Sequence, residues 1–228
     1  MSTHIKEYKP PRNLSAFIET YWLGDFNLDS IETYRQQVVP NGNLELIIHL
    51  DDDHCSLLKS GAWDSTPDYI LVGMYTRPYE VRFSEHVKVF GIRFKPDGLY
   101  SVFRVPPAEF TECFDDMTHI AGREFRDLCS RLKEKEKISE RLNLVSNYLT
   151  QNLNRSEGHY NYIHHAAELI RKSNGMIRMD ELKEKVYISA RQLEREFKRK
   201  IGITPKMYTR IRRFNAVQEL LSKTNTLD

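Results

Sequence analysis

Between residues 34 and 94, short hydrophobic segments are separated by turn-forming residues. Tyr79–Phe83 alternates apolar and polar residues, Val87–Phe94 does so with one glycine, and Leu44–Leu50 is almost continuously apolar. The intervening segments are rich in Pro, Asn, Gly, Asp and Ser, which favour turns. Short strands at this spacing indicate an antiparallel sandwich or a small barrel. Gly91, inside its strand, predicts a β-bulge.

After residue 98 the hydrophobic period becomes helical. We predict helices over Glu109–Phe114, Ile120–Lys133 and Ile138–Leu153, the last because one apolar stripe runs along it. The polar segment Asn152–Gly158 predicts an interdomain linker. We therefore expect an α+β protein, in which residues 1–155 form an N-terminal antiparallel β-rich barrel or sandwich with trailing helices and a core that ends before the linker.

Residues 156–228 show helical periodicity only, which predicts an all-α unit. A stripe of small and branched apolar residues ends near Gly175 and comprises Ile163, Ala166, Ala167 and Ile170. A short helix is expected over Asp180–Val186, followed by a tight break. Ser189 and Gln192 have the S-x-x-Q spacing of a capping box, which predicts the start of a new helix that ends at Gly202.

A last helix is predicted to begin at Thr204 and Pro205, since Thr is a good N-cap and Pro suits the first helical position. Its apolar stripe comprises Tyr208, Ile211, Phe214, Val217 and Leu221. The order of short helix, three-residue break and capped second helix is the helix-turn-helix pattern. The two helices would pack through Leu182, Val186, Ile188, Leu193 and Phe197.

The second helix of this pattern has a basic outer face. Arg191, Arg195 and Lys198 are spaced i, i+4 and i+7, so they point the same way. Such a face can enter a DNA major groove, where guanidinium groups bond guanine edges or hold phosphates. A solvated basic face on an ordinary helical domain is the alternative. The predicted break, cap and apolar contacts all agree with the DNA interpretation.

The balance of positive and negative charge also changes near the predicted boundary at residue 155. Lys and Arg number 15 and Asp and Glu number 9 from Ser156 onward, a net charge of +6, whereas the preceding residues carry a net −4. Such a division suggests two units, of which the basic one contacts a polyanion. Within Arg191–Arg213, nine basic residues accompany only two acidic ones.

The segment Ile188–Phe214 resembles the AraC/XylS family of transcription regulators. Its S-x-R-Q-L-x-R-x-F, G-x-x-P-K and R-F elements match, and the similarity extends from Tyr160 to about Thr224. The N-terminal part is similar to a sensor region found in a subset of that family, through elements such as Phe17–Trp22, Val39–Gly42 and Phe90–Leu99. The resemblance implies a sequence-specific transcription regulator that responds to a small-molecule effector.

By position, the resemblance assigns the base contacts and suggests phosphate contacts. Base contacts map to Ala190, Arg191, Glu194 and Arg195. Phosphate contacts are expected at Lys198, Lys206, Arg210 and Arg213, although Arg213 has the alternative of a structural ion pair. Family members carry two helix-turn-helix units joined by a long helix. The sequence ends where the second unit would begin, so we expect a single unit with weakened DNA affinity and fraying from Leu221 onward.

The sensor half gives fewer signals. Six residues could line an effector pocket, with a place in the hydrophobic core as the alternative for each: Tyr21, Trp22, Trp63, Tyr75, Arg77 and Tyr79. His49, His54 and Cys55 lie across a predicted turn and lack the His-x-His spacing of a metal-binding barrel, so no metal or other cofactor is expected. The Asp51–Asp53 run lacks the rest of a calcium loop and is interpreted as a solvated turn.

Motifs of hydrolases, P-loop enzymes and zinc proteases are missing from the sequence, so no enzyme activity and no catalytic residue is expected. No apolar run reaches the ~18–20 residues of a membrane span, no signal peptide is evident, and three distant cysteines favour a reducing, cytoplasmic setting. Expected partners are double-stranded DNA, a small-molecule effector and a second copy in a homodimer. Two alternatives remain: an enzymatic or metabolite-binding barrel fused to a DNA-binding tail, and a protein-interaction module without DNA binding.

Overall fold

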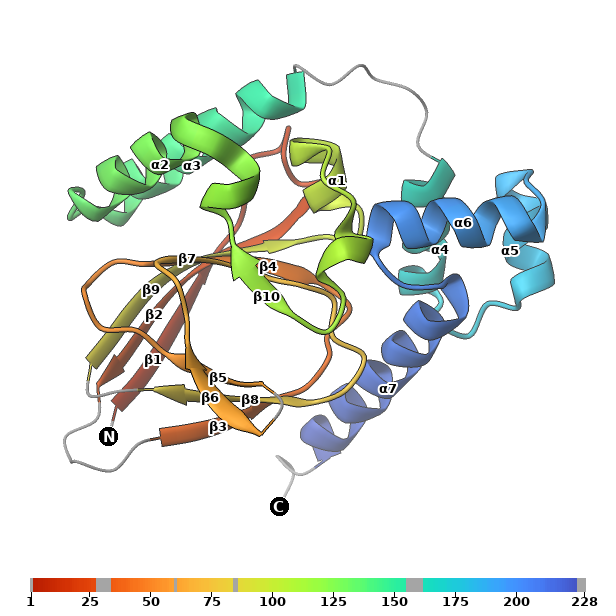
Figure 1. Ribbon diagram of the computed structural model, residues 1–228. Coiled ribbons are helices and arrows are strands. Elements are labelled where there is room, and N and C mark those ends of the chain that lie inside the picture. The colour runs from red at the N-terminus through yellow and green to blue at the C-terminus, as the bar shows by residue number, and fades with distance from the viewer. Residues whose placement is uncertain (1, 28–33, 60, 84–85, 155–161, 225–228) are drawn as a thin grey trace.

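The computed structural model describes residues 2–27, 34–59, 61–83, 86–154 and 162–224, which form an α+β fold (Figure 1). Two antiparallel sheets face each other around a barrel interior. The larger sheet has the strand order β1 (Ser2–Tyr8), β2 (Ile18–Asn27), β9 (His86–Phe94), β4 (Leu44–His49), β7 (Tyr69–Val72) and β10 (Phe114–Asp116). The smaller sheet has the order β3 (Tyr34–Val38), β8 (Tyr79–Phe83), β5 (Ser56–Lys59) and β6 (Ala62–Ser65).

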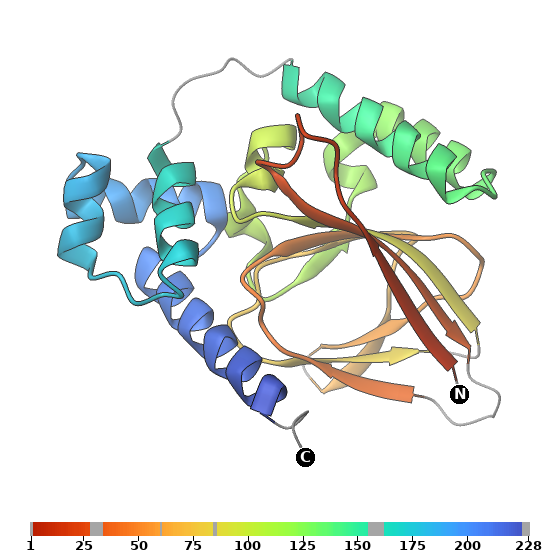
Figure 2. The same ribbon diagram turned by 180° about the vertical axis from the view of Figure 1, so that it is seen from behind.

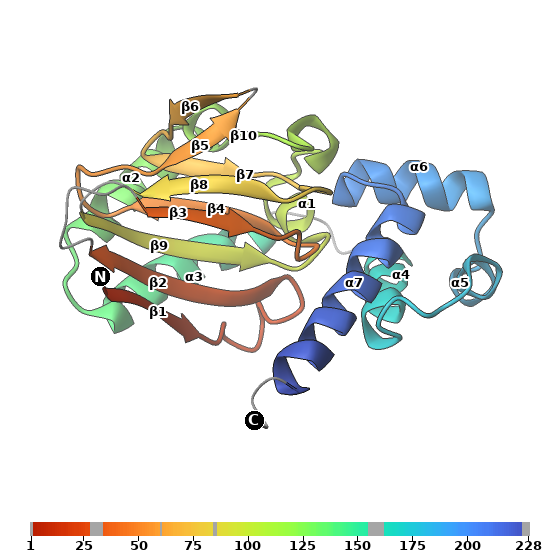
Figure 3. The ribbon, with the colours of Figure 1, turned by 90° about the horizontal axis from the view of Figure 1, so that it is seen from below.

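Helices follow the strands in the chain. The first group covers one face of the larger sheet and comprises α1 (Gly98–Phe103), the 3-10 helix η1 (Pro107–Phe110), α2 (Thr118–Lys133) and α3 (Ile138–Asn154). The second group lies beside the barrel and comprises α4 (Tyr162–Lys172), α5 (Met179–Val186), α6 (Ala190–Ile201) and α7 (Pro205–Thr224). Figures 2 and 3 show α7 running across one end of the barrel.

The two faces of the larger sheet have different surroundings, because successive side chains of a strand point to opposite faces. Leu46, Ile48 and Phe90 belong to the core that the helices cover. Ile70 and Val89 belong to a second cluster inside the barrel. The neighbouring aromatics of β2 are separated in the same way. Tyr21 faces the helices, where its hydroxyl hydrogen-bonds Ser146 of α3 at 3.1 Å, and Trp22 faces the barrel interior.

The sequence-based prediction of a helix over Glu109–Phe114 is wrong. The segment forms the end of η1 and then β10, which pairs with β7 through Phe114 and Val72. Backbone pairing to an existing sheet outweighs the local helical preference. The end of η1 passes close to the backbone of Gly73, since a Cβ at Gly73 would lie 1.5 Å from the Phe110 carbonyl oxygen.

The predicted β-bulge at Gly91 is also wrong. Gly91 pairs in regular register with Trp22 of β2 and Ile47 of β4, and the register shift of β2 lies instead between Ile18 and Thr20. The glycine makes room for an indole, because a Cβ there would lie 1.9 Å from a ring carbon of Trp22. Strands β1 and β2 lie before residue 34, where the hydrophobic pattern predicted no strand.

The expected core ending before residue 155 is not observed. One cluster of buried side chains runs from Leu14 and Phe94 in the barrel half to Tyr208 and Ile211 of α7. Of the predicted linker, residues 152–154 are the end of α3 and residues 155–158 lie outside the described part of the chain. The two halves therefore share a continuous apolar interface.

Candidate nucleic-acid interface and barrel cavity

The short helix α5 and the helix α6 form the predicted pair with a tight break between them. Tyr187 takes the left-handed conformation (φ 55°) that ends α5. The Ser189 hydroxyl accepts a hydrogen bond from the Gln192 backbone N–H at 3.2 Å, which caps α6. Gly202, with φ 99°, ends α6, and the Thr204 hydroxyl caps α7 by accepting from the Met207 N–H. The start and end signals in this segment are confirmed.

Both helices bury their apolar sides, and α4 contacts each of them. Leu182 and Val186 of α5 and Leu193 and Phe197 of α6 are buried, as predicted, and Ile188 is half-buried. Removing such side chains from water supplies the main stabilisation of a small helical unit. The apolar side of α6 is thereby committed to packing, which leaves its opposite side facing solvent.

That solvent side carries the residues assigned to base contacts. Ala190, Arg191, Glu194 and Arg195 are all exposed, and so is Lys198. The Arg195 side chain is 71% exposed, although its Nε donates to Glu196 at 3.2 Å. The cap at Ser189 places Arg191 and Arg195 on the first turns of α6. The exposed groups form a basic surface along α6, defined by Arg191, Arg195 and Lys198, which we call the outer face.

The predicted phosphate contacts on α7 are exposed as well. Lys206 and Arg213 line a groove of about 420 Å³ between the α4–α5 segment and α7, and Arg210 lines a neighbouring groove beside the barrel. The first groove also contains Arg178, which sequence reasoning missed because it stands alone in a mixed segment. Gly175 allows its segment to pass close to α7 at the groove wall, since a Cβ there would lie 2.4 Å from the Thr209 carbonyl oxygen.

A second set of basic residues points toward the barrel half, and we call it the inner face. Arg199 of α6 donates to the Tyr100 hydroxyl, and its guanidinium lies 4.9 Å from the centre of that ring. Arg171 of α4 pairs with Glu19 at 2.7 Å. The inner face is thus bound to the N-terminal half through specific polar contacts.

His164 adds a titratable contact to the inner face. Its Nδ1 lies 2.9 Å from an oxygen of Asp97, a carboxyl in a side chain that is only 1% exposed. The hydrogen bond to Asp97 raises the pKa of His164 above its usual 6.5, against the opposing effect of burial. The charged imidazolium is therefore favoured at this interface.

The segment between β3 and β4 connects the barrel interior with α7. The Asn215 side chain of α7 donates to the Asn41 carbonyl at 3.1 Å. Gly42, with φ +80°, lies against Tyr208, whose ring would be 2.9 Å from a Cβ at that position. Asn41 also lines the barrel cavity, so one short segment touches both the cavity and α7.

The barrel interior contains a cavity of about 170 Å³. Its wall is mainly apolar, and its polar groups gather around Glu45 and Arg93, which pair across β4 and β9 at 2.7 Å. Arg93 also contacts Glu7 at 3.0 Å. Burial raises the pKa of the Tyr79 phenol, so this group keeps its proton.

Of the six residues proposed for an effector pocket, Trp22 and Tyr79 line the cavity. Tyr21 lies on the other face of the sheet. Trp63 lies on β6 beneath the guanidinium of Arg82, at 4.8 Å. The Tyr75 ring lies tilted against Tyr79, with the ring centres 4.2 Å apart, and is not part of the cavity wall, and Arg77 is exposed. Sequence reasoning missed the Glu45–Arg93 pair, whose only signal was a charged residue inside each of two apolar strands.

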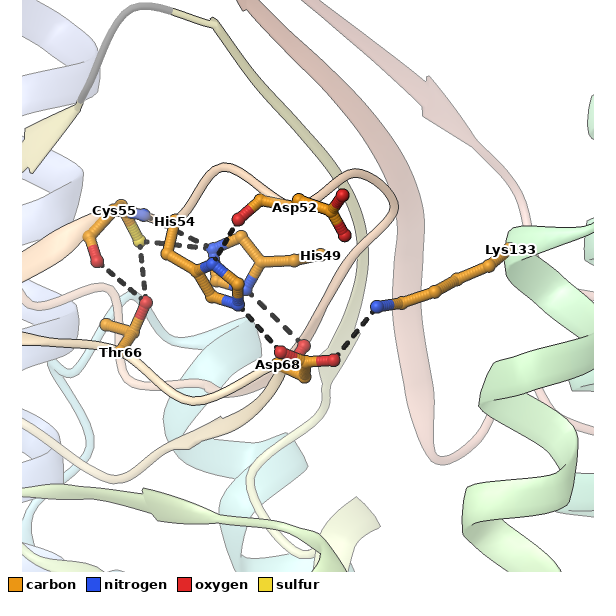
Figure 4. A network of polar contacts seen from close by, with 7 residues as sticks. All are labelled: His49, Asp52, His54, Cys55, Thr66, Asp68 and Lys133. Atoms are coloured by element: carbon orange, nitrogen blue, oxygen red, sulfur yellow. Dashed lines mark hydrogen bonds and ion pairs between the residues drawn. The ribbon is translucent and has the colours of Figure 1, made fainter.

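A polar network lies at one end of the barrel (Figure 4). His54 contacts Asp68 at 2.8 Å, and Lys133 of α2 bonds the second oxygen of that carboxyl at 2.9 Å. Burial lowers the pKa of His49 to about 4 and raises the pKa of the neighbouring Cys55 thiol. A neutral imidazole beside a protonated thiol is not an activated nucleophile, so the network ties strands to α2.

Among the described residues, no group of three or more His, Cys, Asp and Glu side chains is arranged to hold a metal ion. Within the same described ranges, none of the helices combines the length and the apolar character needed to cross a bilayer.

Comparisons with known proteins give the following similarities. Residues 6–114 match a protein family described as a domain of unknown function (DUF6597). The crystal structure of apo ToxT from Vibrio cholerae is 10% identical, with a TM-score of 0.46, and the match covers 88% of this chain and 82% of that one. The AraC-like transcriptional activator CuxR is 11% identical, with a TM-score of 0.30, and the match covers 94% and 86%.

A third similar structure covers the barrel alone. The cupin domain of an XRE-family transcriptional regulator from Enterobacter cloacae is 14% identical, with a TM-score of 0.31, over 41% of this chain and 96% of that one. No curated protein matches this chain.

Proposed function

We propose that this protein is a sequence-specific, DNA-binding transcription regulator of the AraC/XylS type. The observation that carries the proposal is α6: it follows a tight break, is capped by Ser189, and exposes the whole outer face while its apolar side is buried. A helix presented in this way can lie in a DNA major groove. The family-specific motif spanning Ile188–Phe214 supports the same assignment.

Within this proposal, Arg191 and Arg195 read bases. Both are exposed on the first turns of α6, and a guanidinium can bond the O6 and N7 atoms of guanine together. Ala190 is small enough to approach a thymine methyl, and Glu194 can accept from a cytosine amino group. Only these contacts carry sequence information, because phosphates are the same at every base pair.

Lys198, Lys206, Arg210 and Arg213 hold phosphates in the proposed complex. Arg178 joins them, because it shares a groove with Lys206 and Arg213. These contacts set affinity and its salt dependence rather than sequence preference.

The barrel acts as the sensor in this proposal. An effector in the cavity would shift DNA affinity only by binding two arrangements of the protein with different affinity. The β3–β4 segment supplies a physical link, since Asn41 lines the cavity and contacts Asn215 of α7. A small displacement at the cavity wall would therefore reach the helix that follows α6.

The test is a selection from random duplex DNA with the full chain, followed by fluorescence anisotropy on the selected sequence at several salt concentrations. We expect enrichment of a defined sequence. Lys206→Ala should weaken binding to selected and random DNA alike and reduce the slope of affinity against salt by about one. Arg126→Ala, an exposed arginine on α2, is the matched control and should change neither. No enriched sequence and no salt-dependent binding would refute the proposal.

A further inference from the structure

The outward face of the smaller sheet carries two arginines side by side. Arg35 of β3 lies directly opposite Arg82 of β8 in the antiparallel register. Their neighbours Gln36 and Val81 line the barrel cavity, and successive side chains of a strand point to opposite faces. Both arginines therefore point away from the barrel. This face is turned toward the viewer in Figure 3, where none of the described helices lies in front of it.

One indole ring holds both guanidinium groups. Trp63 of β6 pairs with Leu58 of β5, and both face outward because the adjacent Leu57 lines the cavity. The guanidinium carbon lies 5.4 Å from the centre of the Trp63 ring in Arg35 and 4.8 Å from it in Arg82. A guanidinium that stacks on a ring is held in place, while the N–H groups at its edge can still donate to an anion.

The positive charge of the two arginines is not balanced by a bound carboxylate. Among the described residues, neither Arg35 nor Arg82 forms an ion pair, although Glu80 lies two positions from Arg82 on the same face and Asp64 is next to Trp63. Like charges directly opposite each other in a sheet are destabilising. An anion between the two guanidinium groups would offset this repulsion and accept charge-assisted hydrogen bonds from both.

We propose that Arg35, Arg82 and Trp63 bind the phosphate group of a small phosphate monoester. Such a group carries a charge of about −1.5 to −2 near pH 7 and three strong acceptor oxygens, so it matches two guanidinium groups in both charge and hydrogen bonding. A phosphodiester of DNA carries only one negative charge per phosphate and matches the pair less well. The site lies outside the barrel cavity, and binding there requires neither DNA nor an effector in the cavity.

The experiment compares three phosphate compounds at constant ionic strength. Glycerol 2-phosphate is a monoester, dimethyl phosphate is a diester with one charge, and a short DNA duplex carries diesters in a polymer. Binding to the full chain is followed by the ¹H–¹⁵N signals of its two tryptophan side chains, with Trp63→Phe used to assign the Trp63 signal.

We expect millimolar glycerol 2-phosphate to shift the Trp63 signal in a saturable way. The signal of Trp22, which faces the barrel interior, should stay unchanged and serves as the internal control. Dimethyl phosphate should bind about 10-fold more weakly, the effect of losing one charge-assisted hydrogen bond. The DNA duplex should leave the position of the Trp63 signal unchanged, because its contacts are proposed for α6 and α7.

Three variants test the contacts. Arg35→Gln and Arg82→Gln each remove one charge and keep a polar side chain, so each should weaken binding of glycerol 2-phosphate by about 10-fold. Arg77→Gln, an exposed arginine before β8 that does not contact Trp63, is the matched control and should bind as the unmodified protein does.

A second measurement does not depend on the tryptophan signal. Glycerol 2-phosphate should raise the urea midpoint of the unmodified protein and of Arg77→Gln, because a ligand that binds only the folded state stabilises it. The increase should be lost in a chain that carries both Arg35→Gln and Arg82→Gln. Dimethyl phosphate or DNA shifting the Trp63 signal as strongly as the monoester, unchanged affinity in the two arginine variants, or no Trp63 shift with glycerol 2-phosphate would each overturn the proposal.

Discussion

The outer and inner faces of the C-terminal helices are built from the same residue types but have different surroundings. On the outer face, Arg195 is 71% exposed and pairs with Glu196 of the same helix. On the inner face, Arg199 lies on Tyr100 and Arg171 pairs with Glu19 of the barrel half. Arg195 and Arg199 are four positions apart on the same helix, yet the first is a candidate DNA contact and the second is an interface contact. The number of positive charges alone does not distinguish the two roles.

The largest expected effect concerns the inner side of α7. Tyr208→Ala should lower the free energy of unfolding by about 3–5 kcal/mol, because a fully buried aromatic ring that packs on Phe197 and Gly42 is lost. Urea denaturation followed by circular dichroism measures the change. The matched control is Tyr187→Ala, a tyrosine that is 92% exposed, which should stay within about 0.5 kcal/mol of the unmodified protein. Equal losses in the two variants would mean that α7 does not pack on the barrel half as described.

The second prediction compares two arginines of α6. Arg195→Ala should weaken binding to the selected DNA by about 1–3 kcal/mol and relax preference at one base pair, with little change in stability. Arg199→Ala should leave the base preference unchanged and lower the free energy of unfolding by about 0.5–1 kcal/mol, since it loses the ring contact with Tyr100. Anisotropy with a set of single-base variants measures the preference, and urea denaturation measures the stability. The comparison fails if Arg199→Ala also changes the preferred base.

The third prediction concerns the cap that orients the outer face. Ser189→Ala removes the acceptor of the Gln192 N–H and should cost about 1 kcal/mol of stability. Ser130→Ala is the control, because Ser130 bonds a carbonyl within α2 and caps nothing. Amide exchange at the first turn of α6 should accelerate only in the first variant. Unchanged exchange there would show that Ser189 does not hold the start of the helix.

The smallest effect concerns the His164–Asp97 contact. The pKa of His164 is raised in the folded protein, so its stabilising contribution is complete below the unfolded value of about 6.5 and is lost as pH rises through the higher folded value. Glu168 acts in the same direction as Asp97, and Lys95 opposes both. The stability difference between the unmodified protein and His164→Gln should therefore shrink from pH 6 to pH 8.5, by less than about 1 kcal/mol. A pH series of urea denaturation curves measures it, and a difference that grows with pH would contradict the assignment.

The local features of the C-terminal helices could be predicted from the residues alone. The Ser189 cap, the end at Gly202 and the Thr204 cap depend on hydrogen bonds between residues three or four apart, so they can be inferred without a fold. The apolar spacing of Leu193 and Phe197 likewise fixed which side of α6 is buried. The exposed positions of Arg191 and Arg195 follow directly from that assignment.

Features that depend on contacts between distant parts of the chain became visible only in the folded protein. The segment Glu109–Phe114 looked helical, yet it leaves η1 and enters strand β10 at Phe114, because β7 offered backbone partners more than 40 residues earlier. Gly91 looked like a bulge, but the indole of Trp22, far away in sequence, required its missing side chain. The shared core under Tyr208, the separation of the inner from the outer face, and the barrel cavity arise only when strands and helices meet. Hydrophobic periodicity along the sequence indicates which residues are buried, but it does not identify the residues that pack against them.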